Sequence, residues 1–425
     1  MSPGAVAVRD GRIAAVGAPD AVRAAYPGAA VRDLGAAILA PGFVDAHCHL
    51  EWALTAGLAP SGEFGRWLGA FLDAVGAAGP EFLAASADAG ALAALRAGTT
   101  TLCDSGPTGV GAAALTTVGL RGWSCVEAFG SGDASSLGPP LERLRAGIAR
   151  AESAAGPRVQ VGVSPHAPYS VGPALWEALR DDPDLGVRPW STHLAESVAE
   201  RQAITTGDGT IASALERRSV RPAMWPGVPG AGVITRLDAA GALRRGMVAA
   251  HCVQIDADEP ALLAAHGVAV AHCPISNARL GPGTAPLADL VGAGVRVGLG
   301  TDSPGSAGCY DVRAEARACE LVQGAQGASL TPRELVRLAT LGGAEALGCD
   351  DEIGSISVGK CADLIALTPA GHVAGSDPHF ALLDPATSVT HVWVHGQLRV
   401  EDTRVREADV AGIAARAHEA RRLVC

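Results

Sequence analysis

Short apolar runs alternate with longer amphipathic stretches along most of the chain, and this alternation predicts parallel strands joined by helices. The helical stretches include EFLAASADAGALAALRAG and PLADLVGAG. Eight strand-like runs can be read, in chain order ILAPGFVDAHCHL, TTTLCDSG, GWSCVEAFG, VQVGVSPHAPYS, RPWSTHLAES, MVAAHCVQI, VAVAHCPISN and VRVGLGTDS. Eight such units indicate an α/β fold, a (β/α)8 TIM barrel, over residues 41–349.

The two ends of the chain follow a different pattern. GAVAVRDGRIAAVG alternates apolar and polar residues around a D-G turn, which is typical of a β-hairpin. ADLIALTPAG and SVTHVWVHGQLRVE near the other end are also strand-like, with a turn at H-G. We expect residues 1–40 and 350–425 to build a small β-sandwich from both termini, with a tail helix, around the inserted barrel.

One stretch interrupts the barrel pattern. Residues 220–233 read VRPAMWPGVPGAGV, a Pro/Gly-rich excursion between the fifth helix and the sixth strand. Loops of this length are uncommon unless they are functional, so this segment is expected to border a substrate.

Composition narrows the classes of protein that the chain can belong to. Hydrophobic residues make up 48% of 425 residues, enough for a large core. The net charge of -11 comes without a basic cluster, which argues against nucleic-acid binding. No signal peptide or membrane-spanning run is evident, and the ten cysteines form no CxxC pair. We expect a soluble, cytoplasmic protein with reduced thiols and no membrane association.

Histidines recur at the predicted C-terminal ends of the strands, where barrel enzymes place their catalytic groups. His47 and His49 end the first strand and share a face, because alternate residues of a strand point the same way. The other candidates at strand ends are His166, His193, His251, His272 and Asp302. A lone histidine there is usually a core or turn residue, which still suits His272 and partly His166, but not the whole set.

Such a set predicts a metal centre. Three neutral imidazoles and one carboxylate can bind a divalent ion and leave a position for water, whose pKa the ion lowers. Glu196 follows His193 by three residues and would return over the metal if the chain turns there. It would then carry protons beside the activated water. The alternative for Glu196 is an ordinary glutamate at a helix start.

The ordered motifs PGFVDAHCHLE, SPHAPYS, THLAES, AHCVQID, CPISNARLG and GTDSPGS resemble the amidohydrolase superfamily, in its branch of nucleoside deaminases and chlorohydrolases. The resemblance extends over almost the whole chain, including the tail IGSISVGKCADLIAL. It implies one divalent ion, zinc first, with iron or manganese as alternatives. The implied metal ligands are His47, His49, His193 and Asp302.

The resemblance also implies roles around the metal. Glu196 becomes the proton shuttle, His251 orients the attacking water or the developing oxygen, and Asp302 accepts the water proton. His166 becomes a substrate contact, and Asn277 supports the loop after the seventh strand. A homodimer is a further expectation that rests on the resemblance alone.

The single lysine discriminates within this superfamily. Members with two bridged metals need a modified lysine on the fourth strand, but VQVGVSPHAPYS has none and Lys360 lies in the tail. The site is therefore expected to be mononuclear. Two departures from the family pattern stand out: the N-terminal part looks abbreviated, and Cys48 occupies the middle of H-x-H where threonine is common.

The expected activity is hydrolytic deamination of an aminopurine nucleoside. The segments EFGRWL and "RLDAAGAL" resemble the subgroup of 6-aminodeoxyfutalosine deaminases of an alternative menaquinone route, so that carboxylated nucleoside is the first substrate expected. Its pocket would need aromatic walls and a cation, for which the candidates are Trp52, Trp67, Trp225 and Arg279. The alternatives are deamination of S-adenosylhomocysteine, methylthioadenosine or adenosine, hydrolysis of a C–Cl or amide bond, and a non-catalytic barrel.

Overall fold

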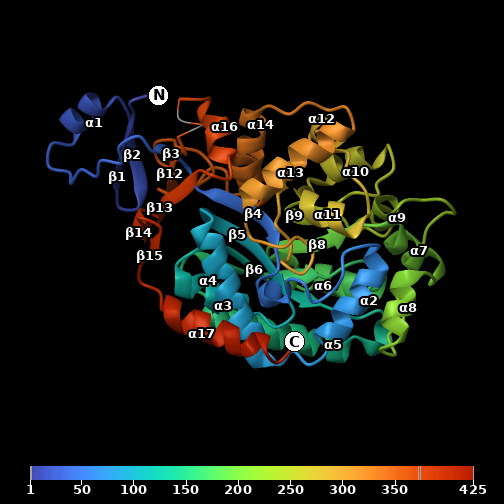
Figure 1. Cartoon of the computed structure of the whole chain (residues 1–425). Coiled ribbons are helices and arrows are strands. Elements are labelled where there is room, and N and C mark those ends of the chain that lie inside the picture. Colours follow the sequence, from blue (N-terminus) through green and yellow to red (C-terminus); the bar gives the residue numbers. More distant parts are fainter. Residues whose placement is uncertain (1, 372, 374, 425) are drawn as a thin grey trace.

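A barrel of parallel strands forms the centre of the computed structural model, which describes residues 2–371, 373 and 375–424 (Figure 1). The barrel strands lie side by side in the order in which they follow one another in the chain. The strands are β4 (Phe43–Cys48), β5 (Thr99–Gly106), β6 (Arg121–Ala128), β7 (Val159–Pro165), β8 (Trp190–Leu194), β9 (Met247–His251), β10 (Ala269–His272) and β11 (Val297–Leu299). The predicted (β/α)8 fold and its eight strands are confirmed.

The barrel closes between its first and last strands at a short seam. The residues that pair there, Cys48 and Asp302, form an isolated parallel bridge. The amide of Asp302 donates to the carbonyl of His47 at 3.0 Å, and the amide of His49 donates to the carbonyl of Asp302 at 3.1 Å. The carboxylate of Asp45 reinforces the seam by accepting from both the amide and the hydroxyl of Thr301. Residues predicted to bind metal therefore also close the barrel.

Helices cover the outside of the barrel and bury their apolar sides against it. The predicted helices at 81–98 and 286–294 are observed as α3 (Pro80–Arg96) and α12 (Leu287–Gly292). The remaining outer elements are α4 (Gly111–Val118), η2 (Ala134–Ser136), α5 (Gly138–Ala154), α6 (Pro173–Asp181), η3 (Leu185–Val187), α9 (Val233–Ala239), α10 (Glu259–His266), α11 (Pro274–Leu280), α13 (Val312–Ala325), α14 (Pro332–Arg337), η4 (Leu338–Gly342) and α15 (Gly343–Ala346).

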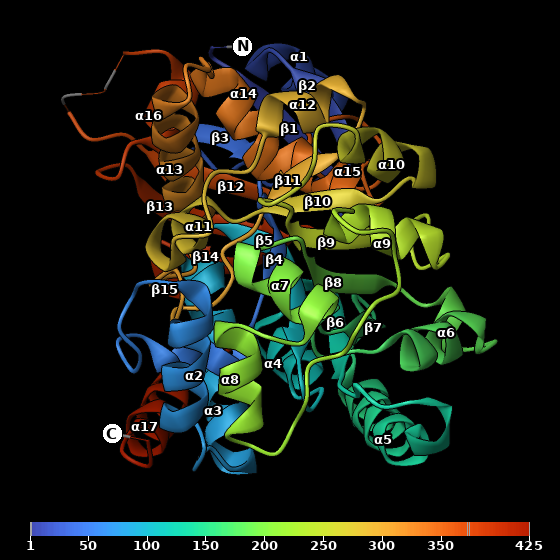
Figure 2. The ribbon, with the colours of Figure 1, turned by 90° about the vertical axis from the view of Figure 1, so that its right-hand side faces the viewer.

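Two insertions cover the C-terminal end of the barrel. After β4 the chain forms η1 (Leu50–Thr55) and α2 (Phe64–Ala74), and after β8 it forms α7 (Val198–Thr206) and α8 (Thr210–Glu216). Figure 2 shows α2, α7 and α8 side by side in front of the strands. The hydroxyl of Thr210 donates to Glu63 at 2.8 Å, and Arg218 pairs with Asp73 at 2.6 Å, so α2 and α8 are joined.

Both chain ends contribute β-structure, as predicted. The hairpin β1 (Ala5–Arg9) and β2 (Arg12–Gly17) turns at Asp10 and Gly11, both with positive φ, and is followed by α1 (Pro19–Ala25). A separate antiparallel sheet joins one N-terminal strand to four C-terminal strands: β3 (Ile38–Pro41), β12 (Leu364–Thr368), β13 (Ser388–Val394), β14 (Gln397–Glu401) and β15 (Arg404–Val405). β3, and not the hairpin, thus supplies the N-terminal strand of the larger sheet.

The passage from this sheet into the barrel depends on one glycine. Gly42 separates β3 from β4, and a Cβ atom there would lie 2.1 Å from the hydroxyl oxygen of Thr100. Any larger residue would therefore push the first barrel strand away from the second. The hairpin contacts the segment that leads into β12 through the amide of Ile13, which donates to the carbonyl of Lys360 at 2.8 Å.

The tail helix α17 (Val410–Arg421) returns to the barrel after α16 (Pro378–Leu383) and the last strands. It packs on α3, where Arg416 pairs with Asp88 at 2.8 Å (Figure 1). Arg421 donates to the carbonyls of Leu54 and Ala56. The C-terminal helix thus holds the loop that follows the first barrel strand.

The excursion at 220–233 has no regular structure before α9 begins at Val233. Its Trp225 is buried, and the indole nitrogen donates to the carbonyl of Pro168 at 2.8 Å. The amide of Ala223 donates to the carbonyl of Tyr169, also at 2.8 Å. The excursion is therefore pinned to the loop that follows β7.

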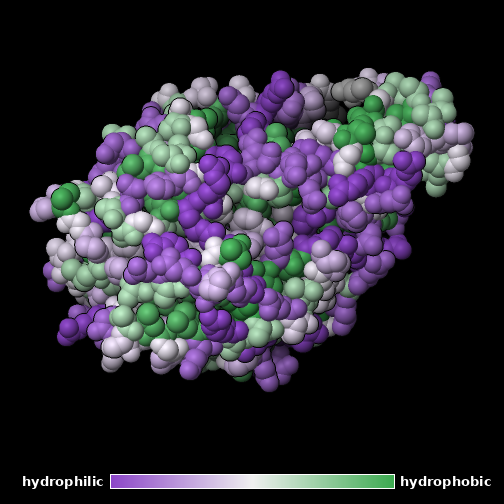
Figure 3. Space-filling view, turned by 180° about the vertical axis from the view of Figure 1, so that it is seen from behind, coloured by the Kyte–Doolittle hydropathy of each residue, from purple (hydrophilic) through white to green (hydrophobic). Residues whose placement is uncertain are grey.

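The surface is mixed in character. On the face seen in Figure 3, hydrophilic residues are interspersed with small hydrophobic groups, several of them on the projecting N-terminal part. Among the described residues, no helix combines the length and apolar character needed to cross a membrane. The cysteines in the described part of the chain are all unpaired, in agreement with the expected thiols.

Asp104 is a buried acidic residue of β5 whose protonation state can be tested through the stability of the protein. It accepts hydrogen bonds from the amide of Leu50 and the hydroxyl of Ser124. Burial, and then the charge of Glu51, raises its pKa from 3.8 to about 8. The folded state therefore keeps a proton that the unfolded chain releases, and the resulting stability is greatest below the unfolded pKa and is lost as pH rises towards the folded pKa.

We expect the free energy of unfolding of the natural chain to fall relative to that of Asp104→Asn as pH rises. The slope should be about 1.4 kcal/mol for each pH unit between about pH 5 and pH 7. Urea titrations of the two proteins at several pH values measure this difference. A difference that stays constant would show that Asp104 is ionised in the folded state.

Candidate metal centre and active site

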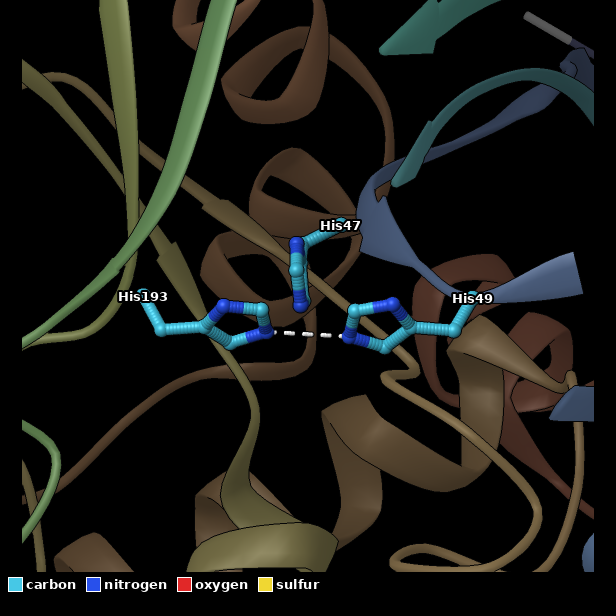
Figure 4. A group of neighbouring side chains, drawn as sticks. All are labelled: His47, His49 and His193. Atoms are coloured by element: carbon cyan, nitrogen blue, oxygen red, sulfur yellow. Dashed lines mark hydrogen bonds between the residues drawn. The ribbon is translucent and has the colours of Figure 1, made fainter. Parts of the chain in front are cut away.

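Three histidines from two barrel strands meet at the C-terminal end of the barrel (Figure 4). His47 and His49 come from the end of β4, and His193 comes from β8. The Nε2 atoms of His49 and His193 lie 2.9 Å apart, and their rings are almost coplanar, at 7°. The ring of His47 stands edge-on to both, at 88° and 90°. His47 and His49, predicted as a pair on the first barrel strand, thus meet His193, predicted on the fifth.

The hydrogen bonds of the His49 and His193 rings indicate that a cation belongs between them. Nδ1 of His49 donates to the carbonyl of Ser105 and Nδ1 of His193 donates to that of His166, both at 2.7 Å. The proton of each ring therefore sits on Nδ1, and the bare Nε2 lone pairs face each other. Two lone pairs at 2.9 Å repel unless a cation lies between them.

His47 supports the same conclusion. It is fully buried, and neither of its ring nitrogens has a hydrogen-bond partner among the described residues. Burial, and then the neighbouring His49, lowers its pKa well below its usual value, so the ring is neutral and able to bind a metal. The donor set fits a borderline divalent ion.

Asp302, the fourth ligand predicted, lies beside these histidines after the end of β11. Its Oδ1 lies 3.4 Å from Nε2 of His49, and its Oδ2 accepts from the hydroxyl of Ser276 at 2.6 Å. Burial opposes its ionisation, but the surrounding imidazoles and the Ser276 hydroxyl outweigh it and lower the pKa. Asp302 therefore offers a carboxylate beside three neutral imidazoles.

Unusual backbone conformations gather at this end of the barrel. Ala195, His251, Cys252 and Asp302 have φ values of 50°, 74°, 45° and 55°, which residues other than glycine rarely adopt. Each of them lies at or just after the end of a barrel strand. Such strain persists only where the surroundings fix it, and it is concentrated at functional sites.

The chain turns at Ala195, as predicted, and Glu196 comes to lie beside His251. The carboxylate of Glu200 accepts from the amides of Ala195 and Glu196 and so holds the turn. Oε1 of Glu196 then lies 3.8 Å from Nε2 of His251. Ser197 caps α7, and Glu200 is the acidic residue of its first turn, so Glu196 has no role in starting that helix.

Glu196 is suited to carrying a proton. It is buried, and burial, followed by the charges of Asp302 and Glu200, raises its pKa well above the usual value. Burial thus favours the protonated form of this carboxyl group, which can donate its proton.

His251 is held in one orientation by a side chain of α11, the helix that follows β10. Its Nδ1 lies 3.0 Å from Oδ1 of Asn277, so Nδ1 donates and Nε2 faces Glu196. Asn277 thereby acts on the site through His251. In contrast, His272 belongs to neither of the groups of potential metal ligands found among the described residues. It is buried, as a core residue would be, but neither of its ring nitrogens has a hydrogen-bond partner among the described residues.

His166 borders the site from β7, with its ring centroid 4.8 Å from that of His193. Its Nδ1 is 2.7 Å from the hydroxyl of Ser170. The exposed ring of Phe129 lies 4.7 Å from His166 on the outer side. His166 therefore stands between the metal ligands and solvent.

The aromatic candidates divide into two groups. Trp67 stacks on Phe71 at 5.0 Å, Trp52 contacts the same ring at 5.5 Å, and a Cβ at Gly305, three residues after Asp302, would meet Phe71 at 3.2 Å. Trp225, however, packs on Trp176 and lines an outer depression. Trp67 and Trp52 thus lie near the strand-eight loop, and Trp225 does not.

Two basic residues can also be placed. Arg279 is exposed at the end of α11, and its guanidinium approaches Gly308, close to the loop after β11. Its contact with substrate stays a prediction. Lys360 donates to the carbonyl of Ile353 in the tail, far along the chain from every barrel strand. The described site therefore contains no lysine to bridge a second metal.

Glu127 was not singled out from the sequence. It lies near the C-terminal end of β6, is buried, and its Oε1 is 3.8 Å from Nδ1 of His49. Burial, and then the charges of Glu51 and Asp104, raises its pKa well above the usual value. The one signal available was an acidic residue near a predicted strand end, in GWSCVEAFG.

The geometry predicts one tightly bound divalent ion per chain. Removing a ligand, in His193→Ala or Asp302→Ala, should abolish binding of the ion and leave a folded protein, because neither side chain belongs to the apolar core. Elemental analysis of the purified variants, with circular dichroism as the folding control, measures this. Two ions in each active chain would contradict the argument from Lys360.

Comparison with known proteins agrees with this geometry. A family model described as the amidohydrolase family matches residues 38–399, and a model of an imidazolonepropionase-like composite domain of bacteria matches residues 4–29. The 5-methylthioadenosine/S-adenosylhomocysteine deaminase of Syntrophobacter fumaroxidans is 31% identical over 98% of this chain and 92% of its own length.

Solved structures show the same architecture. An adenosine deaminase of Xanthomonas campestris with bound zinc superposes with a TM-score of 0.82 at 28% identity, over 100% of this chain and 94% of its own. The aminofutalosine deaminase of Helicobacter pylori, in complex with methylthio-coformycin, has a TM-score of 0.78 at 20% identity over 94% and 95%. The chain therefore belongs to the amidohydrolase family and its deaminase branch, and it is a hydrolase that acts on C–N bonds.

Proposed function

We propose that this protein deaminates adenosine nucleosides that carry a 5′-thioether, methylthioadenosine and S-adenosylhomocysteine. The observation that carries the proposal is the similarity, over nearly the whole chain, to a deaminase named for those two compounds. Another relative, 31% identical over 79% of this chain, is the 5′-deoxyadenosine deaminase of Methanobrevibacter smithii. The compounds in these names all contain an adenine ring and a ribose without a 5′-hydroxyl.

The comparisons favour this alternative over 6-aminodeoxyfutalosine, the substrate expected first from the sequence. The aminofutalosine deaminase of Helicobacter pylori is only 20% identical, a likeness that shows the fold alone. The same holds for the atrazine chlorohydrolase of Arthrobacter aurescens, at 24% identity. A role in menaquinone biosynthesis therefore has no support beyond the two segments that suggested it.

The residues of the site divide the work of deamination. A divalent ion held there, for which we propose zinc, would supply a water of lowered pKa. Asp302 would accept a proton from the attacking water, and Glu196 would deliver a proton to the ring nitrogen beside the amino-bearing carbon. His251, held by Asn277, faces the oxygen that develops at that carbon. The amino group would take up the proton held by Asp302 and leave as ammonia as the C–N bond breaks. The new hydroxyl would return its proton to Glu196 as it becomes the ring carbonyl.

Glu196→Gln tests the proton carrier. The amide keeps the size of the side chain but has no acidic proton, so metal content should stay at one per chain while kcat falls roughly 100- to 10,000-fold. Ammonia release and elemental analysis of the same preparation measure both quantities. A loss below about tenfold would remove Glu196 from the mechanism.

Substrate choice is tested by kcat/KM for five compounds: methylthioadenosine, S-adenosylhomocysteine, adenosine, 5′-deoxyadenosine and 6-aminodeoxyfutalosine. We expect the two thioethers to be preferred. Arg279→Met should lower kcat/KM for the carboxylated compounds and spare methylthioadenosine, because only a carboxylate needs the guanidinium. Preference for 6-aminodeoxyfutalosine would overturn the proposal, and equal losses on all substrates would remove Arg279 from carboxylate recognition.

A further inference from the structure

Glu127 is a buried carboxyl group whose position the deamination chemistry leaves unexplained. Its side chain is about 3% exposed, and its Oε1 has no hydrogen-bond partner among the described residues. The nearest polar atom in an ion-pair contact is Nδ1 of His49, at 3.8 Å, which is too far for a hydrogen bond. That nitrogen already donates to the carbonyl of Ser105. A buried acceptor of this kind calls for a donor from outside the chain.

A second metal ion is one candidate partner, because Glu127, His166 and His193 offer ligand atoms within 4.8 Å of one another. However, this group shares His193 with the histidine cluster. Nδ1 of His193 donates to the carbonyl of His166, so only its Nε2 can bind an ion, and Nε2 faces His49. Nε2 of His193 can bind only one ion. An ion bound by the three histidines would therefore leave no imidazole nitrogen of His193 to bind a second ion beside Glu127.

The position of Glu127 in the barrel suggests a different partner. Glu196, His251 and Asp302 follow β8, end β9 and follow β11, so the reacting carbon must lie on their side of the mouth. Glu127 comes from β6, which is separated from β9 by two strands and from β11 by another two. It therefore faces the part of the substrate that is remote from the leaving amino group.

The proposed substrates have few hydrogen-bond donors that could reach Glu127 far from the reacting carbon. In an aminopurine ribonucleoside with a 5′-thioether, the amino group is at the reacting carbon and the 5′-hydroxyl is absent. The donors common to the class are then the 2′- and 3′-hydroxyls of the ribose. A carboxyl group can accept from two adjacent hydroxyls, one on each oxygen.

We propose that Glu127 is the residue that recognises the ribose, through hydrogen bonds from its 2′- and 3′-hydroxyls. This inference rests on the proposed function and deepens it. His166 lies beside Glu127, and the exposed Phe129, two residues further along the chain, contacts the outer side of His166. The 5′-substituent would leave the buried site past these rings.

The test compares two substrates that differ only in the hydroxyls, adenosine and 2′,3′-dideoxyadenosine. The natural enzyme should prefer adenosine by at least about 30-fold in kcat/KM, because a site built for hydroxyls is left with an unpaired buried acceptor by the analogue. In Glu127→Leu most of that preference should vanish, with the loss falling on adenosine. Glu127→Gln, which keeps one acceptor oxygen, should be intermediate.

Glu51→Gln is the matched control. Glu51 is equally buried, but its carboxylate is fully engaged by the amides of Thr108 and Gly109 and the hydroxyl of Thr108, so its loss should leave the preference for adenosine unchanged. Elemental analysis of every variant establishes that the metal is retained.

Each other outcome has a definite meaning. Equal losses on both substrates in the Glu127 variants would show a structural role and overturn the inference while the deaminase assignment stands. Loss of metal in Glu127→Gln would show that Glu127 is a ligand, which also overturns it. If the natural enzyme releases no ammonia from any nucleoside, the proposed function is wrong and the inference fails with it. This outcome is measured on the natural enzyme alone, so it is distinguishable from a failure of the inference about Glu127.

Discussion

The closure of the barrel between its first and eighth strands is the constraint on which the site depends. The seam consists of a bridge between Cys48 and Asp302 and backbone hydrogen bonds that involve His47 and His49. The same residues that complete the sheet therefore present the ligand atoms. The buried carboxyl group of Asp45 also joins β4 to the segment after β11, at Thr301. A shift of β4 against β11 would therefore open the barrel and move the potential ligands apart at the same time. Fold and metal centre are thus one structure.

Burial gives the site its chemical character by removing charge. Imidazoles that lose water become neutral, and the pKa values of His47, His193 and His251 are all lowered for that reason first. Carboxyl groups respond in the opposite direction, and the pKa values of Glu196 and Glu127 are raised. The pKa of Asp302 is instead lowered, because this carboxyl group lies among the imidazoles. A dication would meet neutral donors, one carboxylate and a proton donor at hand.

The sequence by itself predicted the barrel architecture and the histidines that gather at its C-terminal end. A strand period of two places His47 and His49 on one face, and the repeated strand-helix pattern places His193, His251 and Asp302 at strand ends. These are local consequences of chain geometry, so they can be read without coordinates. The turns at Asp10 and at His395 followed by glycine are equally local, since both need left-handed backbone. The single lysine limited the metal chemistry through composition alone.

Only the tertiary structure decided which side chains from distant strands are left without partners. Asn277 orients His251, and Glu200 holds the turn before Glu196. Oε1 of Glu127 has no hydrogen-bond partner among the described residues. Each of these facts depends on how the residues pack together in space. The tryptophans show the same limit: Trp67 lies near the strand-eight loop, whereas Trp225 packs on Trp176. Sequence gives residue type and periodicity, but the partner of a buried polar group is set by where the strands and loops come together in space.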